Sequence, residues 1–165
     1  MRQEHLNLWR DYYPPEYPQL KLSLGAIELV LFEEEILAFN RIPIAEKEIS
    51  RTPGGVTIIS DVCQMPHYSW SLELHLGIPQ MDKLSAIDFI SDSNRKISRS
   101  NYEITLQDIC KPILELDATR PNALSWSVQT EGLIKYFAQF KVLINSLESI
   151  SNGYGYNATV ELIEV

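Results

Sequence analysis

The chain has 165 residues, of which 45% are hydrophobic and 22% charged, a composition typical of a folded domain and not of a disordered segment. Its net charge of −8 argues against nucleic acid or an anionic membrane surface as the main ligand, and two cysteines are too few for a disulfide scaffold. The first residues lack a secretory leader, and no apolar run reaches the roughly 20 residues that cross a bilayer. We therefore expect a cytoplasmic protein.

Residues 1–19 are rich in proline and aromatic residues. Proline disfavours helix, so we expect these residues to form an extended arm on a single globular domain that spans residues 1–165. Large aromatic side chains are common at the centres of protein interfaces. They either bind a partner or hold the N-terminus against the sheet. The candidate partner-binding residues are Trp9, Tyr12, Tyr13 and Tyr17.

The next segments read mainly as strands. Alternation of apolar and polar residues predicts a strand at Leu20–Leu24. Residues 26–39 fit either two strands that turn at Glu33–Glu35 or one amphipathic helix, and their β-branched and aromatic content favours the strands. Further on, the sequence Thr52–Pro53–Gly54–Gly55 predicts a turn, and residues 56–60 a short strand.

The tripeptide Ser-Trp-Ser occurs twice, at Ser69–Trp70–Ser71 and at Ser125–Trp126–Ser127. Each copy lies in an alternating stretch, which predicts strands at residues 68–76 and 124–128. In both stretches the tryptophan shares a face with aliphatic residues, so we expect Trp70 and Trp126 to be buried core residues. A last alternating stretch predicts a closing strand at residues 156–163.

Two segments have the apolar spacing of amphipathic helices. The first is residues 81–90, followed by a polar loop at 91–101. The second is residues 131–151, with Thr130 as a plausible N-cap and Gly153 after its end. We therefore expect an α+β fold. It would be a single domain whose largely antiparallel sheet has about 5–7 strands, with two or three helices packed on one face and the longest helix at about 131–151.

One cluster contains side chains that bind metals or act as nucleophiles, and its members are Asp61, Cys63, His67 and His75. Thiolate and imidazole groups are zinc ligands, and a Cys–His pair oriented by an aspartate would form a nucleophilic site. Against both interpretations, Pro66 interrupts the loop and no second cysteine or histidine pair completes a familiar spacing. We expect no metal and no cofactor, and we assign no catalytic residue.

The absence of a catalytic motif, together with the acidic charge and the aromatic N-terminus, favours a non-enzymatic protein that binds another protein or itself. An immunity-type neutraliser of a basic partner and a component of a larger assembly both fit this expectation. The alternative is a metal- or small-ligand-binding enzyme that uses the cluster around Cys63. We expect neither nucleic acid nor a membrane among the partners.

Overall fold

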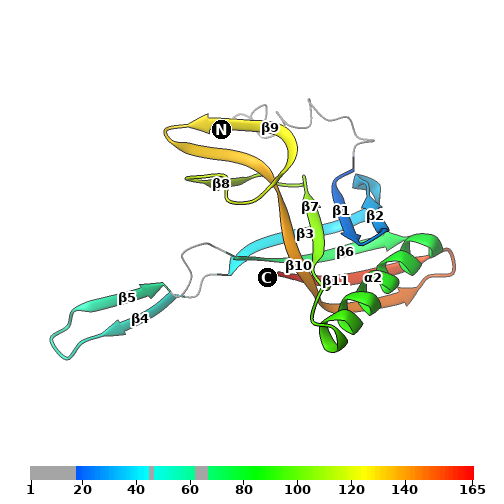
Figure 1. Ribbon diagram of the computed structural model, residues 1–165, viewed down its shortest axis with the longest axis horizontal. Coiled ribbons are helices and arrows are strands. Elements are labelled where there is room, and N and C mark those ends of the chain that lie inside the picture. Colours follow the sequence, from blue (N-terminus) through cyan, green and yellow to red (C-terminus); the bar gives the residue numbers. More distant parts are fainter. Residues whose placement is uncertain (1–17, 45–46, 62–66) are drawn as a thin grey trace.

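The computed structural model describes residues 18–165 apart from 45–46 and 62–66 (Figure 1). Its core is a curled sheet in which every neighbouring pair of strands is antiparallel. In spatial order the strands are β2 (Ile27–Leu31), β1 (Leu20–Leu24), β7 (Ile104–Asp108), β10 (Leu133–Ser151), β11 (Tyr156–Glu164), β6 (His67–Leu76) and β3 (Ile36–Ile44).

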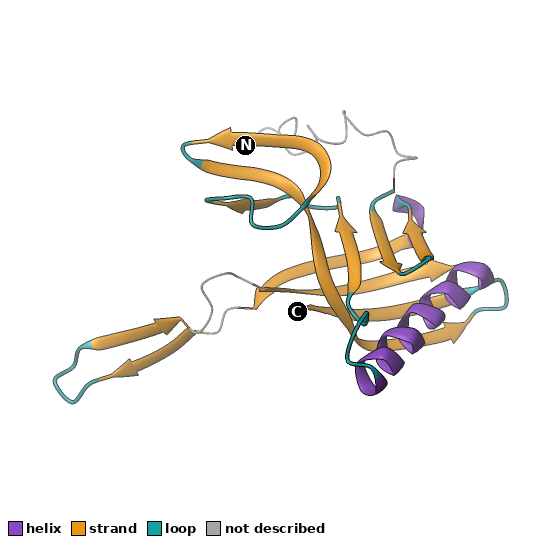
Figure 2. Cartoon of the chain, in the orientation of Figure 1, coloured by secondary structure: helices purple, strands orange, loops and turns teal. Residues whose placement is uncertain are grey.

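Strand β10 is the longest strand, with 19 residues, and it joins two parts of the fold. Its first residues pair with β8 (Ile113–Glu115) and β9 (Asn122–Thr130), and its later residues pair with β7 and β11. A separate hairpin is formed by β4 (Lys47–Arg51) and β5 (Thr57–Asp61), which pair with each other. Figure 2 shows this hairpin projecting away from the curled sheet.

The core lies on the inner side of the curl and follows the two-residue period of the strands. On β6, for example, Trp70, Leu72, Leu74 and Leu76 are buried while the residues between them are exposed. Helix α2 (Ile78–Ile97) packs on β1, β2 and β6 and buries Met81, Leu84 and Ile87. Each such aliphatic side chain contributes about 1.5–3 kcal/mol by leaving water.

The prediction of a helix at residues 131–151 is wrong, because residues 133–151 form strand β10. Glu131 and Gly132 both have positive φ, at 52° and 80°, and the flanking Thr130 and Leu133 are paired. These two residues are therefore a two-residue hairpin turn of type I′ rather than the start of a helix. Alternating burial then runs along the strand at Tyr136, Ala138, Phe140 and Val142.

The helical stripe in that segment has a physical explanation. Strand β10 is covered on both faces near its start, because Phe137 is buried as well as its neighbours Tyr136 and Ala138. Apolar residues on both faces obscure the two-residue period and leave some of them spaced three and four residues apart.

The α+β prediction as a whole is also wrong. The described residues are mostly strand, with one α-helix in place of two or three, and nine strands are joined in the main sheet. The helix expected at residues 81–90 exists but runs to Ile97, through part of the predicted loop. Asp92 accepts hydrogen bonds from Arg95 and Lys96 in this last portion. Residues 26–39 form β2 and the start of β3, joined by a 3-10 turn at Glu33–Glu35.

Candidate interaction surface

The strands that carry the projecting hairpin are tied together inside the sheet. Arg41 on β3 and Trp70 on β6 are cross-strand partners, and both donate to the same carboxylate oxygen of Asp108 on β7, at 2.7 and 3.0 Å. The Arg41 guanidinium also donates to the backbone oxygens of Lys111 and Pro112. Because all three side chains are buried, this cluster fixes β3 and β6 where they lead into the hairpin.

A second polar cluster lies beside it, centred on Arg120. Its guanidinium is shared between Glu115 and Glu164, and the Tyr136 hydroxyl donates to Glu115 at 2.8 Å. The Tyr68 ring lies between the two clusters, with the guanidinium carbons of Arg41 and Arg120 at 5.3 and 5.4 Å from its centre. These contacts join the end of β11 to β6, β8 and β10.

Burial governs the titration of the two tyrosines in this region. Desolvation raises the pKa of Tyr68 above its usual value near 10, against the opposing charges of Arg41 and Arg120. Desolvation likewise raises the pKa of Tyr136. Both hydroxyls therefore stay protonated around neutral pH, which suits Tyr136 to its role as a donor to Glu115.

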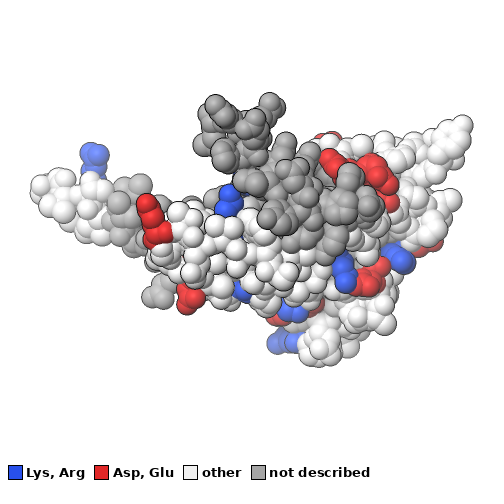
Figure 3. Space-filling model, turned by 90° about the horizontal axis from the view of Figure 1, so that it is seen from above, with Lys and Arg blue, Asp and Glu red and all other residues white. Residues whose placement is uncertain are grey.

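We call the hairpin of β4 and β5, residues 47–61, the arm, which is distinct from the N-terminal arm predicted at residues 1–19. Its tip is well defined: Gly55 donates to the carbonyl of Thr52, Val56 donates to the Thr52 hydroxyl, and Gly55 takes a φ of 80° that favours glycine. Two apolar side chains of the arm are open to solvent, Val56 at 63% and Ile58 at 48% exposure. Arg51 is exposed as well. Figure 3 shows the outer end of the arm as largely uncharged surface with a basic patch.

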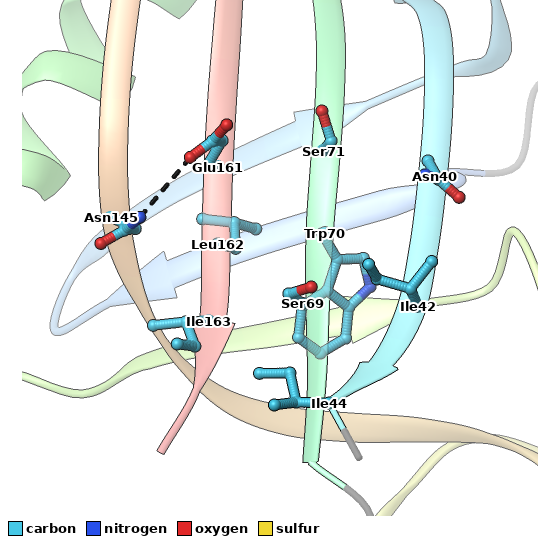
Figure 4. A pocket seen from close by; sticks show the side chains of 10 residues that line it. All are labelled: Asn40, Ile42, Ile44, Ser69, Trp70, Ser71, Asn145, Glu161, Leu162 and Ile163. Carbon is cyan, nitrogen blue, oxygen red and sulfur yellow. Dashed lines mark hydrogen bonds between the residues drawn. The ribbon is translucent and has the colours of Figure 1, made fainter. Parts of the chain in front are cut away.

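A groove lies on the outer face of the sheet next to the arm's base, with a cavity volume of about 370 Å³ (Figure 4). We call it the outer groove. Cross-strand pairing arranges its lining in two rows: Asn40, Ser71 and Glu161 form one, and Ile42, Ser69 and Ile163 form the other. The serines are small and lie between larger residues on the neighbouring strands, which explains the hollow.

The residues of the first Ser-Trp-Ser tripeptide lie on opposite faces of the sheet. Trp70 points into the core and is 1% exposed, whereas Ser69 and Ser71 point outward and line the groove. The burial expected for Trp70 is confirmed. Trp126 is only half-buried and packs against Phe137, with ring centres 5.1 Å apart.

The structure does not bring the histidines of the predicted metal cluster together. His67 and His75 lie near the two ends of β6, eight residues apart, which corresponds to roughly 26 Å along a strand. The His75 ring is hydrogen-bonded to Asn157 at 3.0 Å. Asp61 ends β5, and Cys63 lies outside the described residues. In the part of the chain that the structure describes, no three potential ligands gather into a metal-binding group.

The aromatic candidates Trp9, Tyr12, Tyr13 and Tyr17 also lie outside the described residues. The arm and the outer groove were not predicted as sites. The turn at Thr52–Gly55 was recognisable from its glycines, but the sequence does not show that, among the described strands, those on either side of it pair with each other and not with the main sheet. The groove depends on the register of three strands, which sequence patterns do not reveal.

Comparisons with known proteins leave the family open. No protein-family model matches the sequence, and no curated protein is similar to it at a significant level. Solved structures resemble the fold, among them a chain from the virion of a native gene transfer agent particle. It shares 12% identity over 89% of this chain and 91% of that chain, with a TM-score of 0.43. A similarity this distant carries no functional argument. No helix in the described ranges is long and apolar enough to cross a membrane.

Proposed function

We propose that this protein is a non-enzymatic interaction module, a component of a protein assembly that binds its partner through the arm. The observation that carries the proposal is the arm itself, a two-stranded sheet whose strands pair with each other and not with the main sheet. An isolated two-stranded hairpin is at best marginally stable in water and gains stability by packing against something else. A protein partner would supply that contact.

Two further features support the arm as a binding element. Val56, directly before β5, and Ile58, on β5, expose apolar side chains near the tip of the arm, which water disfavours and a partner would cover. The two strands that lead towards the arm are also held in place, since Arg41 and Trp70 join β3 and β6 to Asp108. A binding element carried on rigid strands loses less conformational freedom on binding than one carried on a mobile support.

The test places a photo-reactive amino acid at Val56 in cells that naturally produce the protein. We expect a covalent adduct of defined mass after illumination. The matched control carries the same amino acid at Ile97, an apolar helix residue that is 85% exposed, and should give no such adduct. Equal labelling at both positions, or none at Val56, would show that the arm has no protein partner.

A further inference from the structure

Resting on the proposed function, we infer that the partner of the arm is a second copy of this chain, whose outer groove receives Val56 and Ile58. The protein would thus carry both halves of one interface. The arm supplies the projecting half, and the groove beside the arm's base supplies the receiving half.

The two surfaces match in apolar character and in spacing. Ile58 lies on β5, and Val56 lies two residues before it, next to the start of that strand, where its carbonyl accepts the backbone N–H of Thr52. Two residues of extended chain span roughly 7 Å, which is the spacing of the two exposed side chains along the arm. The rows of the groove are also two residues apart along their strands, and the row nearer the arm's base is bounded by Ile42 and Ile163. Ile42 is 52% exposed, so its side chain is free to contact an incoming apolar residue.

Their charges match as well. Across residues 50–58, where the structure describes the arm's side chains, Arg51 is the charged residue and there is no carboxylate. Among the lining residues of the groove, the charged one is Glu161, which is exposed and has only a long 3.5 Å contact with Asn145. Residues 47–61 carry two basic and two acidic residues, so the attraction across copies would come from Arg51, near the tip of the arm, and Glu161 in the groove.

The direction of the arm makes the contact intermolecular. The last paired residues of β3 and β6 before the arm are Ile44 and His67, at the end of the groove. From there the hairpin of β4 and β5 extends away from the sheet (Figure 1), so the arm points away from the groove of its own chain. Docking between unlike surfaces builds a ring or a filament, unless two chains exchange arms reciprocally and form a dimer.

The test uses two variants that each lack one half of the interface. Val56→Asp with Ile58→Asp disables the arm, and Ser71→Trp fills the groove. We expect wild-type self-association, measured by light scattering and sedimentation, to weaken by at least about 100-fold in each variant, because the first loses two aliphatic contacts and the second excludes them from the groove. An equimolar mixture should form a one-to-one heterodimer, because one intact arm and one intact groove remain.

Charge reversal provides an independent measurement. Arg51→Glu should weaken self-association about tenfold, and Glu161→Arg in the same chain should restore it, more so at low salt. The matched control is Ile97→Asp with Leu116→Asp, two exposed apolar positions elsewhere, which should associate like the wild type. Circular dichroism spectra identical to the wild type establish that each variant is folded.

Two results would overturn the inference. One is a wild-type chain that stays monomeric at every concentration reached, and the other is a mixture of the two variants that forms no heterodimer. Either result leaves the proposed function separately testable. A cross-link from Val56 to a protein other than this chain would support an interaction module while excluding a second copy as the partner.

Discussion

Trp70 and Asp108 are joined by a 3.0 Å hydrogen bond from the indole nitrogen to a carboxylate oxygen that Arg41 also contacts at 2.7 Å. The other oxygen of Asp108 accepts the backbone N–H of Cys110 at 3.0 Å. One buried carboxylate thus holds the two strands that lead into the arm and the loop that follows β7. The arrangement of three strands of the main sheet depends on this one residue.

Asp108→Ala should destabilise the protein by about 3–5 kcal/mol, because it leaves the Arg41 guanidinium buried without its carboxylate. Urea unfolding followed by tryptophan fluorescence measures the change. The control is Asp82→Ala at an exposed helical position, which should stay within about 0.5 kcal/mol of the wild type. A loss below about 1 kcal/mol for Asp108→Ala would mean that water replaces the carboxylate.

Tyr136→Phe should change how stability depends on alkaline pH. Burial raises the folded-state pKa of Tyr136 above the unfolded value near 10. As pH rises from 10 towards the folded pKa, the unfolded chain releases this proton while the folded chain keeps it, so wild-type stability falls. The variant lacks this contribution, and its free energy of unfolding should fall less steeply above pH 10.

Urea titrations of both proteins between about pH 8 and 11 measure the difference in slope. Tyr154→Phe, at a ring that is 95% exposed, is the matched control and should follow the wild-type profile. Parallel profiles for Tyr136→Phe and the wild type would show that the hydroxyl is open to water.

Gly155→Ala should cost about 1–3 kcal/mol through steric overlap, since a Cβ at this buried position would meet the backbone oxygen of Leu76. Backbone atoms held in a sheet cannot move aside as a flexible side chain does. Gly54→Ala is the control, because its nearest neighbour would be the Thr52 hydroxyl at 3.9 Å. Thermal unfolding should separate the two variants, and equal melting temperatures would contradict the predicted clash.

Glu131→Asn should stabilise the hairpin between β9 and β10 by about 0.5–1 kcal/mol. Glu131 has a φ of 52°, a left-handed conformation that asparagine tolerates better than glutamate, and Asn-Gly is the preferred type I′ pair. Chemical unfolding of the variant and the wild type gives the difference. A destabilised variant would indicate that the Glu131 side chain makes a contact in solution that outweighs the turn preference.

Several elements could be read from the sequence because their signals are local. The strict alternation of residues 68–76 specifies a strand with one buried face, and it places Trp70 inside and the two serines outside. The apolar residues within 81–90 have the spacing of an amphipathic helix, which can be recognised without knowledge of the tertiary contacts. The strand Leu20–Leu24 follows from the same two-residue period.

Other features were decided by tertiary contacts. Strand β10 buries residues on both faces near its start, where Phe137 packs against Trp126, so its local pattern resembled a helix and the turn at Glu131–Gly132 was missed. His67 and His75, close in the sequence, are held apart by an extended strand. The outer groove and the separation of the arm from the main sheet depend on which strands lie side by side. Strand pairing joins residues far apart in the chain, and a local pattern carries no information about the choice of partner.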